Sequence, residues 1–343
     1  PRVRTQQYEG ALRAGSPCVD CMSLSRGDSI RSVDMRLVID TDTGSDDAVA
    51  LMLAVAEPQV SIEAVTTVAG NVPLDLATRN ALYTLELMGA SEVPVHVGCD
   101  RPLLKALETA QWVHGDDGMG DIGLPPPQGS PARVHAVDIL RSLGDGQPGE
   151  LTLVTLGPLT NIAAALARDP HLLTKYRHTY IMGGAPDAIG NVTAVAEYNV
   201  WADPEAAAMT IAAPGAKTLV GWNISRRRAV IGPAERRHLD SMGTELARFT
   251  LDINCVLDRV AREYNGLEGF DLPDPATVAV ALDPSIVTES DTVFMNVATT
   301  GETRGLTYID TRLSEAPPAN ITVVWDVDEE AFKKRLYAMC ALR

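Results

Sequence analysis

The segment from Arg36 to Val55 constrains the fold of this chain more than any other. A short apolar run, Leu37 to Ile39, is followed by four aspartates within eight residues, and these lead into Ala48–Ala56, a run of good helix formers. The four are Asp40, Asp42, Asp46 and Asp47. An apolar run, a turn containing glycine and an apolar helix predict the first strand and helix of a parallel α/β unit. Open α/β sheets bind ligands at the carboxyl ends of their strands, so we expect the aspartates to lie at such a site.

The four aspartates favour a metal site. Carboxylates this close repel one another and are costly to desolvate, so a structural role for all of them is disfavoured. Asp46 and Asp47 alone would be explained by the helix start, where negative charge suits the helix dipole. A hard divalent cation that gathers the oxygens explains the whole group better, and the spacing leaves Ca²⁺ or Mg²⁺ open.

Composition limits the classes of partner and of cellular location. With 343 residues and 45% hydrophobic side chains, the chain can bury one large α/β core or two small ones, and no apolar run approaches the length of about 20 residues that a membrane span needs. A net charge of −16 argues against nucleic acid or an anionic membrane as partner, but not against a neutral polar small molecule. The five scattered cysteines indicate unpaired thiols in a reducing compartment, hence a cytoplasmic protein.

The pattern along the chain predicts an extension followed by one α/β domain. Residues 1–34 have no hydrophobic period and no apolar secretory segment, so we interpret them as an N-terminal extension without chemistry. Residues 35–343 form the predicted catalytic domain, a mostly parallel central sheet flanked by helices. The expected strands are Leu37–Ile39, Ile62–Val68, Val93–Val97, Leu151–Thr155, Thr179–Met182, Thr218–Gly221, Val293–Thr299, Gly305–Asp310 and Asn320–Trp325. The expected helices are Ala48–Ala56, Leu74–Met88, Val134–Leu143, Leu159–Ala167, Pro204–Ile211, Pro275–Ala281 and Asp328–Met339, with residues 233–265 mostly helical.

Polar groups collect after several of the predicted strands. Asn71 follows the second strand, and Asp274 precedes a late helix. Asn191, Glu197 and Asn199 follow the strand that ends at Met182. Amides and carboxylates that converge at one sheet edge suit a ligand with several hydroxyl groups, because each hydroxyl both donates and accepts. The long segment 99–132, rich in Gly and Pro, is predicted to be a functional lid.

These residues resemble the signature blocks of a known family. Asp40-Thr-Asp-Thr-Gly-Ser-Asp-Asp47 resembles the D-x-D-x-G-x-D-D signature of the nucleoside hydrolases, the inosine-uridine preferring family. Further blocks resemble the family in the same order, over roughly residues 35–340. They are Val65-Thr-Thr-Val-Ala-Gly-Asn71, His114-Gly-Asp-Asp-Gly-Met-Gly120, Leu156-Gly-Pro-Leu-Thr-Asn-Ile-Ala163, Met182-Gly-Gly-Ala185, Asn191 with Ala196-Glu-Tyr-Asn199, and Asp203-Pro-Glu-Ala-Ala207.

The resemblance implies an N-ribohydrolase with a Rossmann-like core and one tightly held Ca²⁺. The implied metal ligands are Asp42, Asp47, Asp274 and the backbone carbonyl of Leu156. Asp42 would also be the general base that takes a proton from the attacking water, and Asp40 would support it through hydrogen bonds. The resemblance further implies a ribonucleoside as the small-molecule partner, and a homodimer or homotetramer as the assembly.

The resemblance also assigns the ribose contacts. Asp46 and Asn199 would bind the 2′- and 3′-hydroxyls. Asn191 and Glu197 would hold the 5′-hydroxyl side, and Asn71 would lie near the ribose and the water. His114, in the lid block, would contact the base or the 5′-hydroxyl, unless its role is structural.

The sequence departs from the family pattern at Pro273. In the pyrimidine-active branch a histidine immediately precedes the late aspartate ligand and protonates the leaving base, whereas this chain has proline there. Purine-preferring relatives also lack that acid and stack the base between aromatic rings, so we expect purine nucleosides to be slightly favoured. Trp112, Trp222 and Tyr264 are the candidates for base stacking, and ordinary packing is the alternative for each.

Two other functions fit part of the pattern. Asp40-Thr-Asp-Thr43 after a strand also fits the D-x-D-x-T motif of haloacid-dehalogenase-like phosphatases, with Asp117 and Asp121 as late metal carboxylates. That interpretation leaves the Asp46–Asp47 pair and the later amides without a role. A non-catalytic, Ca²⁺-dependent nucleoside-binding protein is the other alternative, and Pro273 is the feature that favours it.

Overall fold

An eight-stranded sheet forms the centre of the fold in the computed structural model, which describes residues 35–312, 315 and 317–342. The predicted N-terminal extension lies outside the described residues. The strand order is β3-β2-β1-β4-β5-β6-β12-β9, and every neighbouring pair is parallel except β12 with β9. The strands are β1 (Met35–Thr41), β2 (Val60–Thr67), β3 (Val95–Val97), β4 (Leu151–Thr155), β5 (His178–Met182), β6 (Lys217–Val220), β9 (Val287–Val293) and β12 (Ile321–Val327). The predicted α/β class with a mostly parallel sheet is confirmed.

Alternate residues of the central strand β1 enter two different cores. Leu37 and Ile39 belong to one buried cluster, and Val38 belongs to a second. Successive side chains of a strand point to opposite faces of the sheet, so both faces of β1 are covered. The continuous apolar run that predicted this strand is therefore the pattern of a parallel strand buried on both sides.

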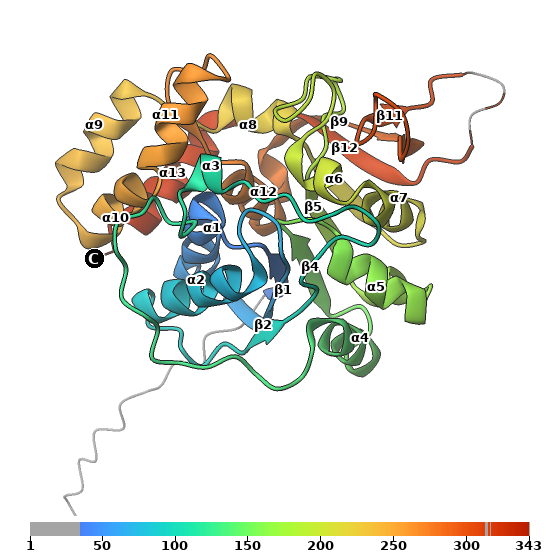
Figure 1. The fold of residues 1–343 in the computed structure, drawn as a ribbon, viewed down its shortest axis with the longest axis horizontal. Helices are drawn as coiled ribbons and strands as arrows, with labels where there is room; N and C mark the ends of the chain where they lie inside the picture. The colour runs from blue at the N-terminus through green and yellow to red at the C-terminus, as the bar shows by residue number, and fades with distance from the viewer. Residues whose placement is uncertain (1–34, 313–314, 316, 343) are drawn as a thin grey trace, which may run out of the picture. The chain divides into compact units, whose positions relative to one another are not determined.

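Helices cover the two faces of the sheet (Figure 1). They are α1 (Ser45–Ala56), α2 (Leu74–Leu87), α3 (Gln111–His114), α4 (Ala136–Gly146), α5 (Thr160–Arg168), α6 (Tyr198–Ala202), α7 (Pro204–Ala212), α8 (Trp222–Arg228), α9 (Pro233–Met242), α10 (Glu245–Ile253), α11 (Cys255–Glu263), α12 (Pro273–Leu282) and α13 (Glu329–Cys340), with short 3₁₀ helices at Leu172–Lys175 and Pro284–Ile286. Residues of α1, α2 and α10 to α13 pack into the core that contains Leu37, and residues of α4, α5 and α7 pack into the core that contains Val38.

Helices α1 and α12 are the innermost helices and pack against each other. In α1 every residue from Ser45 to Ala54 is buried, and in α12 the same holds from Asp274 to Ala281. A helix that is apolar on all sides belongs inside a protein, which explains why both sequences lack a polar face. Each helix carries acidic residues in its first turn.

The structure corrects the predicted elements at a few places. The predicted strand Val293–Thr299 is shorter in the structure, because Val293 ends β9 and only Met295–Val297 forms β10. This strand pairs with β11 (Thr307–Ile309) in a separate two-stranded sheet. Strand β9 escaped prediction because most of its side chains are exposed and polar, as an edge strand allows. Helix α8 and the small pair β7 (Val230–Ile231) and β8 (Phe270–Asp271) were also not predicted.

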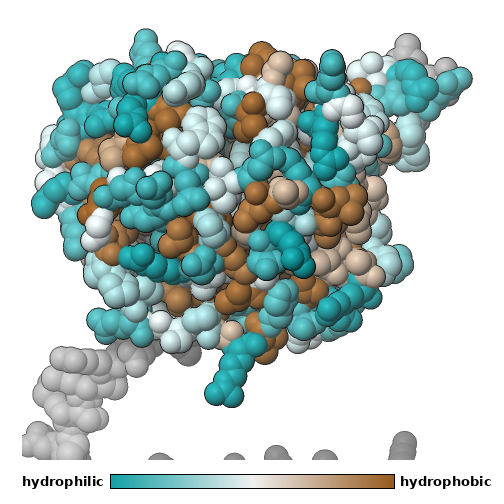
Figure 2. Space-filling view, viewed as in Figure 1, coloured by the Kyte–Doolittle hydropathy of each residue, from teal (hydrophilic) through white to brown (hydrophobic). Residues whose placement is uncertain are grey.

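The surface of the described region is mixed in character. On the face seen in Figure 2, hydrophobic residues are interspersed with hydrophilic ones. Hydrophobic residues scattered in this way are ordinary on a protein surface. Among the described helices, none has the length and apolar character needed to cross a membrane.

Candidate active site

Asp40 is held at the end of β1 by its neighbouring strand and by α5. Thr66 Oγ1 on β2 donates to Asp40 Oδ1 at 2.5 Å, and Asn161 Nδ2 on α5 donates to the same oxygen at 2.8 Å. Burial raises the pKa of Asp40 to about 7, although these two hydrogen bonds lower it. Asp40 is thus completely buried and is held by two side chains from neighbouring elements.

Asp42 is enclosed between two glycines. The backbone N–H of Asn71 donates to Asp42 Oδ2 at 2.6 Å, while Oδ1 has no hydrogen-bond partner among the described residues. A Cβ at Gly70 would lie 2.1 Å from Oδ2, and a Cβ at Gly157 would lie 2.6 Å from Oδ1. Only glycine fits at either position, because real Cβ atoms do not approach so closely. The carboxylate is therefore fixed by backbone on both sides.

We expect the substitution Gly70→Ala to lower kcat by about 100-fold. The new methyl group would meet Asp42 Oδ2 at 2.1 Å and Pro158 Cδ at 2.7 Å, so the carboxylate must shift, and misplacement of a reacting group by about 1 Å costs about that factor. Steady-state kinetics measures the effect. Gly146→Ala in α4 is the matched control, since no heavy atom lies within 4 Å of the new Cβ. An unchanged kcat in Gly70→Ala would show that this enclosure does not matter.

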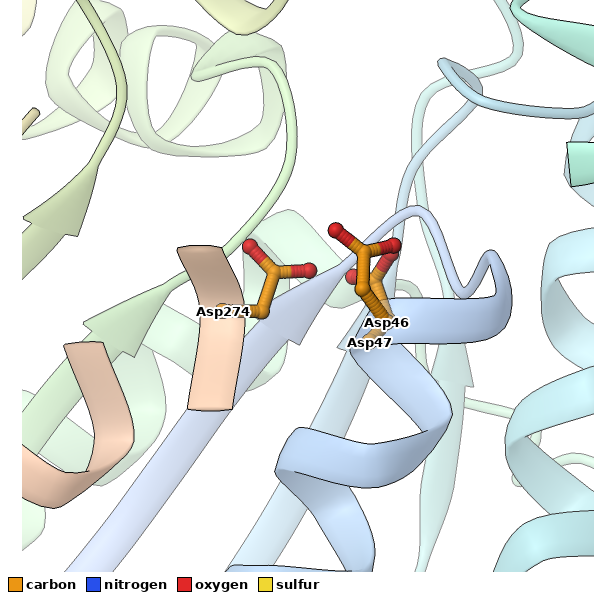
Figure 3. A group of neighbouring side chains, drawn as sticks. All are labelled: Asp46, Asp47 and Asp274. Atoms are coloured by element: carbon orange, nitrogen blue, oxygen red, sulfur yellow. The ribbon is translucent and has the colours of Figure 1, made fainter. Parts of the chain in front are cut away.

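Three carboxylates meet where α1 and α12 begin. Asp46 and Asp47 lie in the first turn of α1 and Asp274 in the first turn of α12, and one oxygen of each lies within 4.8 Å of the others. Figure 3 shows their side chains pointing toward one another across the gap between the helices. Thr41 Oγ1 donates to Asp47 Oδ1 at 2.6 Å, and the backbone N–H of Gly44 donates to Asp47 Oδ2 at 2.9 Å. Both helix N-termini direct their positive dipole ends toward this charge.

The cluster concentrates negative charge in a place that water cannot solvate. Burial raises the pKa of Asp42, Asp46 and Asp274 well above the ordinary value, and the charge of Asp47 raises each further. Burial also raises the pKa of Asp47, against the hydrogen bonds from Thr41 and Gly44. A bound cation would stabilise the ionised form of these buried carboxylates, because it offsets negative charge that water cannot screen.

The donor set fits a hard divalent cation. Asp42 Oδ1 and Asp46 Oδ1 are buried oxygens without a hydrogen-bond partner in the described part of the chain. Unpaired buried oxygens of this kind call for a counter-ion or a ligand. Leu156 lines the same cavity, and its carbonyl oxygen, a further predicted ligand, accepts a hydrogen bond from Asn199 Nδ2 at 2.5 Å. Carboxylate and carbonyl oxygens are the ligands that Ca²⁺ and Mg²⁺ take.

A cavity of about 670 Å³, counted out to its open mouth, lies above this cluster. Asp42 and Asp47 do not line it and are completely buried, so they lie beneath its floor. The polar residues of the lining are Asp46, Asn71, His114, Asn191, Glu197, Asn199, Asn265, Asp271 and Asp274. All six residues that the family resemblance assigned to substrate binding therefore line this one cavity.

The start of α6 fixes the amide side of the cavity. Glu197 caps this helix: its carboxylate accepts from the backbone N–H groups of Gly184, Asn199 and Val200 at 2.6, 2.8 and 3.2 Å. Asn191 Oδ1 accepts from the backbone N–H of Tyr198 at 3.0 Å. Backbone N–H groups therefore hold Glu197 and the amide oxygen of Asn191, and the amide nitrogen of Asn199 bonds the carbonyl oxygen of Leu156.

His114 closes the cavity from the predicted lid. Its Nδ1 lies 3.0 Å from Ser45 Oγ and 3.6 Å from Asp46 Oδ1. Burial lowers the pKa of His114 to about 4, so the imidazole is neutral at ordinary pH. The lid turns back after His114 with three glycines at positive φ; at Gly120, φ is 73° and a Cβ would lie 2.6 Å from the carbonyl oxygen of Ile253.

The three aromatic candidates differ in their place. Trp222 is buried and lines the cavity. Trp112 also lines it but is 53% exposed, and its ring meets Tyr264 edge to face at 6.1 Å between centroids. Tyr264 is 73% exposed and is not part of the cavity lining. Sequence reasoning missed Asp271, which lines the cavity; an acid inside the apolar run 270–273 was its only signal.

Comparison with known proteins agrees with this geometry. Residues 37–334 match the family described as inosine-uridine preferring nucleoside hydrolase. The chain belongs to this family. A probable uridine nucleosidase 2 from Arabidopsis thaliana is 36% identical over 83% of this chain and 88% of the relative. A plant nucleoside hydrolase structure has a TM-score of 0.84 at 32% identity, covering 90% of this chain and 99% of that one. A purine-preferring ribonucleoside hydrolase from Gardnerella vaginalis has a TM-score of 0.83 at 30% identity, covering 90% and 100%.

Family membership settles the class of reaction. The chain is a nucleoside hydrolase, a hydrolase that acts on N-glycosyl compounds. The phosphatase alternative loses its support in the structure as well. The carboxylate of Asp117 accepts a hydrogen bond from the backbone N–H of Asp121, and the carboxylate of Asp121 accepts one from the backbone N–H of Asp117, each at 3.0 Å. Neither residue belongs to the buried carboxylate cluster.

Proposed function

We propose that this enzyme hydrolyses the N-glycosidic bond of ribonucleosides in a Ca²⁺-dependent reaction that yields ribose and the free base. One observation supports the proposal: among the described residues, the buried oxygens Asp42 Oδ1 and Asp46 Oδ1 have no hydrogen-bond partner, and Asp46 lines a cavity together with the amides of Asn71, Asn191 and Asn199. The proposed metal ligands are Asp42, Asp47, Asp274 and the carbonyl oxygen of Leu156. Ca²⁺ at this place would lower the pKa of water and bind sugar hydroxyls.

Asp42 is the proposed general base. Its Oδ1 is free to accept a proton, while the backbone N–H of Asn71 holds Oδ2 in place. A base must lie within hydrogen-bond reach of the water it activates, and the enclosure by Gly70 and Gly157 supports a fixed position. Departure of the nucleobase leaves positive charge on the ribose ring. The carboxylates of Asp46 and Asp274 are proposed to stabilise this charge.

The ribose contacts explain a preference for ribonucleosides over deoxynucleosides. Asp46 and Asn199 are proposed to bind the 2′- and 3′-hydroxyls, Asn191 and Glu197 the 5′-hydroxyl side, and Asn71 the ribose near the water. A site built to bond a hydroxyl strongly rejects the analogue that lacks it, because its buried polar groups are then left unpaired. Asp40, bonded to Thr66 and Asn161, supports the cluster from below.

We expect purine nucleosides to be cleaved faster than pyrimidine nucleosides. Pro273 occupies the position of the acid histidine, and the buried indole of Trp222 offers a stacking surface. The similar proteins include both a probable uridine nucleosidase and a purine-preferring hydrolase, so measured rates are needed to decide between purine and pyrimidine preference. Initial rates on inosine, adenosine, guanosine, uridine and cytidine give kcat/KM for each. Uridine cleaved as fast as inosine would refute the argument from Pro273.

The assembly and the N-terminal segment complete the proposal. We expect a homodimer or homotetramer, which is an inference from the family. We also expect residues 1–34 to carry no chemistry, so that a chain beginning at Met35 has the same kcat as the full one. Both statements stay predictions.

A further inference from the structure

Four apolar residues of the cavity lining come from the helices α8, α11 and α12, and a buried carboxylate accompanies them. Trp222 of α8, Leu257 and Val260 of α11 and Pro273 at the start of α12 line the cavity together with Asp271. Asp271 is 4% exposed. Apolar side chains suit the flat face of a nucleobase, whereas a buried carboxylate among them is costly unless it has a partner. Asp271 therefore requires an explanation that packing does not give.

Among the described residues, the hydrogen bonds that other residues donate to Asp271 reach only one of its two carboxylate oxygens. The indole N–H of Trp222 and the hydroxyl of Ser225 both donate to Oδ2, at 3.0 and 2.5 Å. In the described part of the chain, no other residue donates a hydrogen bond to Oδ1. Burial raises the pKa of Asp271, and the bonds from Ser225 and Trp222 oppose this rise. The arrangement thus leaves one acceptor oxygen for a ligand in the cavity.

The carboxylate is fixed in position by its backbone. Asp271 pairs with Val230 in the antiparallel β7–β8 ladder, and the N–H of Leu272 donates to the carbonyl of Ala229 at 3.0 Å. Phe270 on the preceding position is fully buried. A group anchored in this way is preorganised and cannot turn away from an unsuitable ligand.

We propose that Asp271 is a specificity-determining residue that accepts a hydrogen bond from an exocyclic amino group of the leaving base. This inference rests on the proposed function, since it assigns the apolar part of the cavity to the base. A carboxylate oxygen attracts an N–H₂ group and repels the carbonyl oxygen that replaces it in the related keto base. Amino bases are therefore favoured over their keto counterparts by about ten- to hundredfold, the usual effect of one buried hydrogen bond that is made or lost.

Matched pairs of nucleosides test this inference. Adenosine and inosine form an amino–keto pair, as do cytidine and uridine, and in each the keto member also carries a proton on the adjacent ring nitrogen. Guanosine carries an amino group where inosine has a hydrogen atom. We expect kcat/KM to favour the amino member of at least one pair by tenfold or more. In Asp271→Asn, the amide oxygen can still accept from Trp222 and Ser225, while the amide N–H₂ faces the base. That preference is then lost or inverted, a change of at least tenfold in the ratio.

The controls separate this inference from the proposed function. Asp258→Asn on α11, whose carboxylate pairs with Arg236 and Arg262 and does not line the cavity, should leave the ratios unchanged. If Asp271→Asn does not fold, inhibition of the unaltered enzyme by free bases is measured instead. We then expect adenine to bind at least tenfold more tightly than hypoxanthine, or cytosine to bind at least tenfold more tightly than uracil. An enzyme that cleaves nucleosides without an amino preference overturns this inference alone. An enzyme that cleaves none of them overturns the proposed function and this inference together.

Discussion

The substitution Asp42→Asn is expected to reduce kcat for nucleoside hydrolysis by about 10³-fold or more. General-base catalysis alone supplies about 10²–10⁴-fold, and asparagine cannot take the proton. The backbone N–H of Asn71 can still bond the amide oxygen, so the geometry around Gly70 and Gly157 should be kept. Steady-state rates at saturating substrate and saturating Ca²⁺ measure the loss.

Two further variants show what that loss means. Asp138→Asn, on the exposed side of α4 and paired with Arg168, should keep the full rate. Asp47→Asn should lose activity through weaker Ca²⁺ binding, so high Ca²⁺ partly restores its rate but not that of Asp42→Asn. If Asp42→Asn keeps its rate within tenfold, another group is the base and the assignment fails.

Removal of Ca²⁺ is expected to abolish activity and to lower Tm. The ion would offset part of the negative charge of the buried aspartates, and a ligand that binds only the folded state at 100 times its Kd stabilises that state by about 2.7 kcal/mol. For a domain of this size we expect a rise in Tm of about 5 °C on adding Ca²⁺ to chelated protein. Thermal unfolding and initial rates are measured after EDTA treatment and again after Ca²⁺ is returned.

The chelator itself needs a control. EDTA that has been saturated with Ca²⁺ beforehand should change neither the rate nor Tm. Asp274→Asn removes one carboxylate of the buried cluster and should shrink the Ca²⁺-dependent rise in Tm. Full activity in protein shown by elemental analysis to hold no divalent metal would refute the Ca²⁺ requirement.

The first strand and helix could be predicted because their signals are local. Leu37–Ile39 is apolar because β1 is buried on both faces, and Ala48–Ala56 is apolar because α1 is buried on all sides. The aspartates between them follow the carboxyl end of β1. Their place near a ligand site could be predicted because parallel α/β sheets bind ligands at the carboxyl ends of their strands. Asp274 was different: no local pattern connects it to Asp47, and only the family resemblance placed the two together.

Other features could not be read from the sequence because they depend on distant pairing. Asp271 lines the cavity through its ladder with Val230 and through Trp222, and neither contact leaves a trace near residue 271. Strand β9 is defined by its pairing with β12 while its own side chains are mostly exposed, so it lacks an apolar period. Trp112 lines the cavity and Tyr264 does not, but the sequence alone could not distinguish these two aromatic residues.

The packing of α1 against α12 sets the order in which this enzyme can mature. Asp46 and Asp47 are synthesised early, whereas Asp274 arrives only with the last third of the chain. A growing chain that ends before α12 therefore holds Asp46 and Asp47 but lacks Asp274, the third carboxylate of the cluster, and lacks the helix that packs against α1. If Ca²⁺ binds as proposed, its site would be complete only after α12 has packed against α1, so the ion would stabilise the late stages of folding rather than the early ones.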